Sequence, residues 1–186
     1  VAGDPALGYY SYDVGDWHII ALNSSIDRKV GSPQEQWLRS DLAVHPNACT
    51  LAYWHFPRFS SGSHGNHASV DTFWQALYDN RADIILSGHD HLYERFALQN
   101  PSAQADPTQG IREFVVGTGG ASLGSFTSVQ PNSEKRESAT WGVLKLTLHP
   151  ASYDWQFIPI AGQVFSDSGS SNCITSGPTP TPSNTP

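Results

Sequence analysis

The sequence contains no methionine, only two cysteines and no long apolar run. Without a stretch of about 18 apolar residues there is no membrane-spanning helix, so we expect no membrane partner. Because the chain starts at Val1 with no methionine, we expect it to be a processed or truncated piece of a longer product. Cys49 and Cys173 either close one long disulfide or remain two thiols, and two cysteines do not decide the redox compartment.

Positive charge is also scarce. The 186 residues carry 10 Lys and Arg against 17 Asp and Glu, a net charge of −7. This balance argues against nucleic acid as a partner, because phosphate-backbone contacts need clustered basic side chains. The length is sufficient for one domain with a hydrophobic core.

The first part of the chain predicts two strands and a helix. "GYYSYDVGDWHIIALNSS" indicates strands over residues 10–14 and 18–22 with a tight turn between them. "SPQEQWLRSDLAVH" predicts a helix with Ser32 as the N-cap, Pro33 at the first position and Glu35 three residues after the cap.

Residues 49–87 predict a strand–helix–strand unit. "CTLAYWHFP" is a strand ending at His55, "VDTFWQALYDN" has helical spacing of its apolar residues, and "ADIIL" is a second strand, followed by His89. In a right-handed parallel crossover the carboxyl ends of both strands lie on one edge of the sheet, where open α/β sheets bind ligands.

The remainder is β-rich and then of low complexity. "REFVVGTGG", "TWGVLKLTLHP" and "SYDWQFIPI" predict three strands. We therefore expect a domain over residues 1–165, followed over 166–186 by a disordered linker rich in Ser, Thr and Pro.

Three histidines form the main candidate site. In His89-Asp90-His91 the two imidazoles lie on one face, because side chains alternate along an extended backbone, and His55 arrives from the neighbouring strand. Such a set suits zinc, iron or manganese. The alternative is that all three are ordinary hydrogen-bonded histidines.

"YWHFPRFSSGSH" followed by "ILSGHDHLYER" resembles the last two metal-binding blocks of the calcineurin-like metallophosphoesterases, most closely their secreted, purple-acid-phosphatase-like branch. The flanking sequences are similar as well, so the resemblance runs from about Gly8 to Ile160. It implies an α/β (α+β) fold, with this chain as the C-terminal half of a four-layer αββα sandwich of mixed sheets.

The resemblance also assigns roles. It implies two divalent or trivalent metal ions (Fe, Zn or Mn), with His55 and His89 binding one and His91 the other. A hydroxide bridging the ions would attack a small-molecule phosphate ester, a monoester in the first place and a diester as the alternative. His64 would contact the phosphate or protonate the leaving group, and His67 is a further substrate-binding candidate.

Other blocks of that family are missing. The family needs an Asp-x-His, a Gly-Asp that supplies a bridging aspartate, and a Gly-Asn-His, all N-terminal to the matched region. We interpret Asp16-Trp17-His18 and Gly65-Asn66-His67 as coincidental look-alikes. The expected partner is therefore the missing N-terminal half of the same domain, and we expect the isolated chain to be inactive. The resemblance and the Thr-Pro linker together predict a secreted or cell-surface (extracellular or periplasmic) protein.

Several other residues have weaker patterns. Asp90 should point away from its histidine neighbours and play a structural or supporting part, and Glu94 and Arg95 are expected to form a local ion pair. "GTGG", residues 117–120, is either a turn or a set of N–H groups that binds phosphate. Three further histidines are expected to be structural or solvated: His18, His45 and His149.

Two other functions remain open. One is a complete mononuclear His₃ zinc hydrolase or lyase built on the same three histidines. The other is a non-catalytic, β-rich extracellular binding module on a Thr-Pro stalk.

Overall fold

The computed structural model describes residues 6–45 and 49–174. In chain order its elements are β1 (Tyr10–Val14), β2 (Trp17–Ala21), α1 (Pro33–Val44), β3 (Cys49–Tyr53), the 3₁₀ turn Ala68–Val70, α2 (Asp71–Asp79), β4 (Ile84–Ser87), β5 (Tyr93–Phe96), β6 (Arg112–Val116), β7 (Ser133–Glu137), β8 (Gly142–His149), β9 (Ser152–Pro159) and β10 (Ser168–Asn172). None of the described helices is long and apolar enough to cross a membrane.

Seven strands form one mixed sheet in the order β1-β2-β3-β4-β6-β5-β7. The central strands β2, β3, β4 and β6 run parallel, while β1, β5 and β7 are antiparallel to their neighbours. Their apolar side chains alternate between the two faces: Ile20 packs on the helix side and Ile19 on the other. The sheet therefore has a core on each face.

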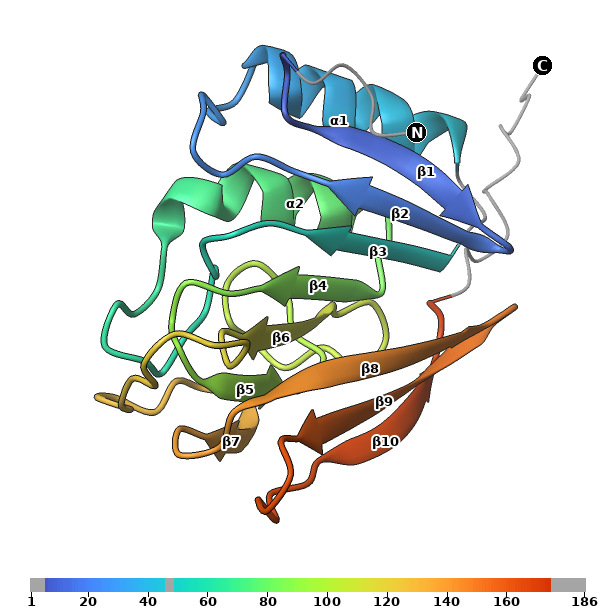
Figure 1. Ribbon diagram of the computed structural model, residues 1–186. Helices are drawn as coiled ribbons and strands as arrows, with labels where there is room; N and C mark the ends of the chain where they lie inside the picture. The colour runs from blue at the N-terminus through green and yellow to red at the C-terminus, as the bar shows by residue number, and fades with distance from the viewer. Residues whose placement is uncertain (1–5, 46–48, 175–186) are drawn as a thin grey trace, which may run out of the picture.

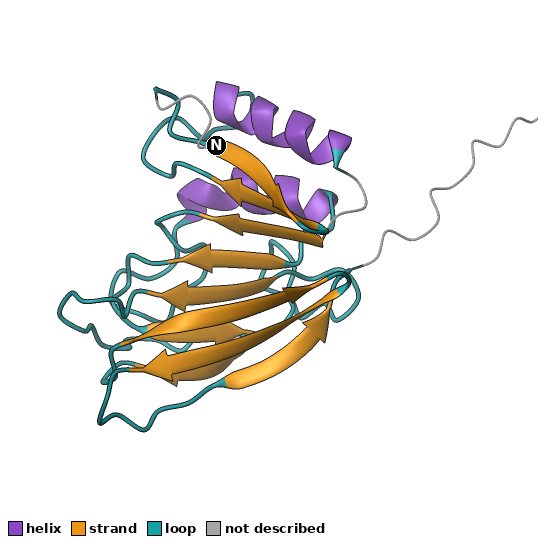
Figure 2. Cartoon of the chain, turned by 45° about the vertical axis from the view of Figure 1, so that its right-hand side comes forward, coloured by secondary structure: helices purple, strands orange, loops and turns teal. Residues whose placement is uncertain are grey.

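Helices α1 and α2 cover one face, and the three-stranded antiparallel sheet β10-β9-β8 packs on the other (Figure 1). In the turned view both helices lie together beside the upper strands of the large sheet (Figure 2). Tyr153, Trp155 and Phe157 of β9 supply the small sheet's part of the core. The described chain thus holds three of the four layers expected from the sequence, a helix layer and two sheets.

Helix α1 begins as predicted. The Ser32 side chain accepts the N–H of Glu35 at 3.3 Å and Pro33 occupies the first turn. The Glu35 carboxylate accepts the N–H of Gly31 at 3.0 Å, so the reciprocal contact goes one residue before the cap.

The C-terminal boundary of the domain requires correction. We expected a linker from residue 166, but β10 pairs with β9 over its whole length, and the Asp167 carboxylate accepts hydrogen bonds from Tyr93 and Arg95. Strand pairing and this ion pair fix a segment whose Ser- and Gly-rich composition gives no apolar signal. The rest of the predicted linker, residues 175–186, lies outside the described residues.

Three strands were not predicted: β5, β7 and β10. The expected ion pair between Glu94 and Arg95 is also wrong, because neighbouring residues of β5 point to opposite faces of the sheet. Arg95 pairs with Asp167 and Glu134 on one face, and Glu94 accepts hydrogen bonds from serines on the other.

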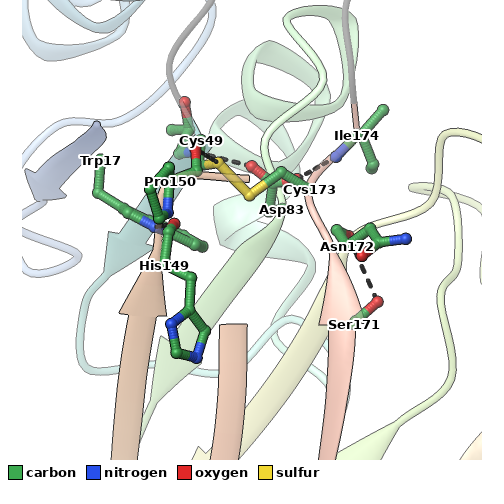
Figure 3. The surroundings of a disulfide bond; sticks show 10 residues. Trp17, Cys49, Asp83, His149, Pro150, Ser171, Asn172, Cys173 and Ile174 are labelled. Atoms are coloured by element: carbon green, nitrogen blue, oxygen red, sulfur yellow. Dashed lines mark hydrogen bonds between the residues drawn. A yellow bond between two sulfur atoms is a disulfide. The ribbon is translucent and has the colours of Figure 1, made fainter. Parts of the chain in front are cut away.

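Cys49 and Cys173 form a disulfide that joins the start of β3 to the residue after β10 (Figure 3). Asp83 lies beside it, and its carboxylate accepts the N–H of Thr50 at 2.7 Å and of Ile174 at 2.5 Å. Each of these amides belongs to the residue that follows a disulfide cysteine. Burial raises the pKa of Asp83 to about 7. The disulfide settles the question that the sequence left open.

Candidate functional site

The site starts at the carboxyl ends of β3 and β4, which are parallel neighbours with Leu51 in register with Ile84. Two residues beyond each strand comes a histidine, His55 after β3 and His89 after β4. The N–H of Gly88 donates to the carbonyl of His55 at 3.1 Å, which ties the two segments together. The sheet therefore delivers both histidines to the same edge.

The rings of His55 and His89 meet edge-on, and a nitrogen atom of each points toward the other. Nδ1 of His89 lies 3.0 Å from Nε2 of His55. His89 adopts a φ of 62°, in the left-handed region that non-glycine residues rarely occupy. At this distance the two nitrogens share a hydrogen bond. Two imidazole nitrogens that bind one metal ion, each about 2.0–2.1 Å from it, also lie about 3 Å apart, so the same geometry suits a metal such as zinc.

His64 and His67 complete a cluster around His89. The ring centroid of His89 lies 4.4 Å from that of His64 and 5.0 Å from that of His67. Phe56 packs against the same group, stacked on His67 and edge-on to His89. Nε2 of His67 is buried and has no hydrogen-bond partner among the described residues, so this nitrogen is available to a ligand.

Both half-buried histidines of the cluster have lowered pKa values. Burial is the main cause for His89, and the neighbouring rings of His64 and His55 add to it. For His67 burial also lowers the pKa; nearby Asp90 acts in the opposite direction but does not cancel the effect. Lowered pKa values favour the neutral imidazole, which is the form that binds metals.

His91 faces elsewhere. It is exposed, and its Nδ1 lies 2.9 Å from the carbonyl oxygen of Ser122. Within residues 6–45 and 49–174, no third His, Cys, Asp or Glu ligand atom joins His55 and His89 in a set that spans 4.8 Å or less. A single-metal His₃ site therefore has no support in this arrangement.

Asp90 turns inward between the two histidines. Its side chain is 1% exposed, and its carboxylate accepts the Ser60 hydroxyl at 2.5 Å and the backbone N–H of His64 at 3.0 Å. A Cβ added at Gly62 would lie 2.3 Å from the Asp90 carboxyl carbon, so only glycine fits there. The supporting part predicted for Asp90 has a concrete form: it holds the loop that carries His64.

Two more buried carboxylates hold the same loop, Glu94 and Glu113, and neither was predicted to do so. Glu94 accepts the N–H of Ser61 at 2.7 Å and its hydroxyl at 2.5 Å. Glu113 accepts the N–H groups of Arg58 and Phe59, and burial raises its pKa to about 8. Loop residues 58–64 are thus fixed by carboxylates from β5, from β6 and from the segment between β4 and β5, which no local sequence pattern reveals.

A second histidine cluster lies on the helix side of the sheet. Nδ1 and Nε2 of buried His18 lie 2.8 and 2.7 Å from carboxylate oxygens of Asp13 and Asp41. His45 stacks on His18 with ring centroids 3.8 Å apart and planes 16° apart. Ring nitrogens bind metals in the ring plane, so near-parallel rings cannot point to one ion. This is an ion-pair cluster, as expected for a structural His18, and its partners do not include Asp16.

The structure also places His149 and the glycine-rich turn of residues 117–120. His149 is exposed and pairs with Asp154 at 2.9 Å, so it is solvated as expected. In the glycine-rich turn, the N–H of Gly117 already donates to Leu92, and a Cβ there would lie 2.0 Å from the carbonyl oxygen of Asp90. Gly117 therefore serves close backbone packing.

Comparison with known proteins gives the family. No protein-family model matches the chain. Among curated proteins, purple acid phosphatase 22 of Arabidopsis thaliana is 34% identical over 141 residues, which are 70% of this chain and 32% of that protein. Purple acid phosphatase 21 of the same plant is 32% identical over 160 residues, 79% of this chain and 36% of that protein.

A solved structure shows the same fold. The purple acid phosphatase PPD1 from yellow lupin (Lupinus luteus) seeds aligns with a TM-score of 0.81 at 21% identity, covering 97% of this chain and 37% of that one. The chain thus spans about a third of the length of the relatives it matches. It belongs to the purple-acid-phosphatase branch of the calcineurin-like metallophosphoesterases and corresponds to a C-terminal fragment of their fold.

Proposed function

We propose that this chain forms part of a metal-dependent phosphoesterase that hydrolyses small-molecule phosphate esters, most simply monoesters. The observation that carries the proposal is the 3.0 Å approach of His55 and His89 at the edge of the sheet, surrounded by His64 and His67. His55 and His89 would hold one metal ion and His91 would contribute to a second, with iron, zinc or manganese as candidates.

The metal ions, His64 and His67 would have different roles in the reaction. Bound metal ions would supply Lewis-acid activation of the phosphate ester and of a water nucleophile. His64, exposed and held through its backbone by Asp90, would contact the phosphate or give a proton to the leaving oxygen. His67 would present its unpartnered Nε2 to a phosphate oxygen.

The expected partner is the N-terminal part of the same fold, and the surface of this chain supports that expectation. Strand β8 is an edge of its sheet, so its outer backbone groups are unpaired with any described strand. Beside it runs an apolar groove lined by Tyr53, Leu86, Val116 and Val143. A further β-strand with an apolar face would satisfy both. We propose that this partner supplies the bridging aspartate and that the chain alone is inactive.

The proposed location is outside the cytosol. The disulfide between Cys49 and Cys173 supports a secreted or cell-surface protein, because disulfides persist mainly in oxidising compartments.

The direct test is metal binding by the purified chain. We expect calorimetric titration with Zn²⁺ or Mn²⁺ to show one site, weakened at least about tenfold by His55→Ala or His89→Ala. His149→Ala, which removes an exposed histidine away from the cluster, is the matched control. Unchanged binding in both cluster variants would refute the metal site. If His91→Ala abolished the same site and the chain were active alone, the mononuclear hydrolase would be correct.

A second test separates the phosphoesterase from a non-catalytic binding module. Coding DNA upstream of Val1 should encode Asp-x-His, Gly-Asp and Gly-Asn-His blocks, and joining that region to this chain should restore hydrolysis of an aryl phosphate. Substitution of His55, His89 and His91 by alanine in the joined protein should abolish the activity. A non-catalytic binding module would show no hydrolysis in the joined protein, and the triple substitution would leave its ligand binding intact.

A further inference from the structure

We infer that Arg28 forms an anion-recognition site beside the histidine cluster and favours phosphate esters whose leaving group carries a second oxyanion, a carboxylate or another phosphate. This inference rests on the proposed function, because it concerns what the same site selects. No motif in the sequence pointed to Arg28.

Arg28 is held in place without being neutralised. Its Nε donates to the carbonyl oxygen of Ser69 at 2.9 Å and its Nη1 to that of Ile26 at 3.2 Å. These two hydrogen bonds fix the plane of the guanidinium. Within residues 6–45 and 49–174, Nη2 has no hydrogen-bond partner and no carboxylate lies within 4.0 Å of the group.

Most described arginines of this acidic chain, with 17 Asp and Glu against 10 Lys and Arg, contact a carboxylate. Four do so: Arg39, Arg58, Arg95 and Arg112. Arg136 of β7 is like Arg28 in having no carboxylate partner among the described residues, and its Nη1 donates to the carbonyl and hydroxyl oxygens of Ser133. An ordered guanidinium that keeps its charge and a free edge is suited to an oxyanion, which it binds through its fork of N–H groups.

The position of Arg28 connects it to the cluster. Its guanidinium carbon lies 6.0 Å from the centroid of the Phe56 ring, and the His89 ring lies 4.7 Å from the same centroid. Phe56 also stacks on His67 at 5.0 Å, and Ser69, which accepts from Arg28, follows His67 by two residues. Arg28 and His89 thus border the same Phe56 ring, which places the guanidinium carbon no more than about 11 Å from the centroid of the His89 ring. A three-carbon leaving group bound through its phosphate at His89 would extend toward this guanidinium.

The test uses a matched pair of ligands. Glycerol 3-phosphate and 3-phosphoglycerate differ in one end group, a hydroxymethyl against a carboxylate. We expect calorimetric titration of the Mn²⁺-loaded chain to show about tenfold tighter binding of 3-phosphoglycerate, because a charge-assisted hydrogen bond in a partly exposed site contributes about 1.4 kcal/mol. A three-carbon bisphosphate serves as the second probe and tells a preference for phosphate from one for carboxylate.

Substitution of Arg28 tests whether this residue causes the preference for 3-phosphoglycerate. Arg28→Gln should remove the tenfold difference and leave the affinity for glycerol 3-phosphate unchanged within twofold, and Arg28→Lys should retain part of it. Lys145→Gln, which removes the same charge from β8, is the control and should change nothing. If the preference persists in Arg28→Gln, or is absent from the wild type while both esters bind, the inference is wrong and the proposed function stands. If neither ester binds and the His89→Ala variant behaves like the wild type, the proposed function fails as well.

Discussion

The carboxylate of Asp90 accepts the backbone N–H of His64 at 3.0 Å, across 26 residues of sequence. Asp90 is flanked by two predicted metal ligands, and His64 is the predicted phosphate contact. One hydrogen bond therefore connects the loop that would bind the metals to the loop that would bind the substrate.

Replacing Asp90 by alanine should loosen the His64 loop more than the rest of the fold. The variant loses acceptors for Ser60 and His64, and we expect a loss of about 1–3 kcal/mol in the free energy of unfolding. Hydrogen exchange measured by NMR should accelerate at the amides of Ser61 and His64 while β3 and β4 stay protected. Equal acceleration throughout the sheet would show that Asp90 supports the whole fold instead of the loop.

His18 should make stability depend on pH. Burial lowers its pKa, but hydrogen bonds to Asp41 and Asp13 outweigh that and raise it above 6.5. The charged form is thus stabilised in the folded state, so the contribution is complete below pH 6.5 and is lost as the pH rises through the folded-state pKa.

We expect His18→Gln to cost about 1–3 kcal/mol at pH 6, and less at pH 9, in urea unfolding. His149→Gln removes an exposed pair and should have almost no effect at either pH. Parallel pH profiles for wild type and His18→Gln would contradict the ion-pair assignment.

Removal of the disulfide should destabilise the chain strongly. The bridge spans 124 residues, and the chain-entropy model gives about 4–5 kcal/mol for a loop of that length. Cys49→Ala combined with Cys173→Ala should lower the urea midpoint accordingly, and reduction of the wild type should reproduce the shift. If the midpoint stays unchanged, the small sheet is held by its apolar contacts alone.

Glu113 should give the opposite pH profile to a carboxylate whose pKa is lowered by an ion pair. Burial raises its pKa to about 8, so the folded state favours the protonated acid. Its contribution is full below pH 4.5 and declines as the pH rises from there to about 8. Glu113→Gln cannot ionise, but its NH2 group replaces one of the two oxygens that accept the N–H groups of Arg58 and Phe59. We therefore expect the variant to be less stable than the wild type at pH 4 and to lose less stability than the wild type between pH 4.5 and pH 9 in urea unfolding. Parallel pH profiles for the variant and the wild type would contradict the raised pKa of Glu113.

The sequence predicted those elements whose pattern lies within a single segment of the chain. The strands of residues 10–21 and the helix capped by Ser32 followed from local periodicity and capping. His55 and His89 could be placed together because parallel strands deliver their ends to one edge.

What the sequence did not reveal depends on distant contacts. Glu94 and Glu113 become supports of the histidine loop only once β5 and β6 lie beneath it. Strand β10 is defined by its pairing with β9 and by the disulfide, since its own residues resemble a linker. Arg28 becomes a candidate binding residue only because the fold places it beside Phe56.

The disulfide at the start of β3 also fixes a direction (Figures 1 and 3). Cys49 lies at the amino end of that strand, whereas His55 lies beyond its carboxyl end, so the two mark opposite poles of the sheet. Ile174, the last residue that the structure describes at this end, lies at the pole of the disulfide. The covalent bridge and the histidines therefore face opposite ways, so a molecule that approaches the histidine edge does not meet the disulfide.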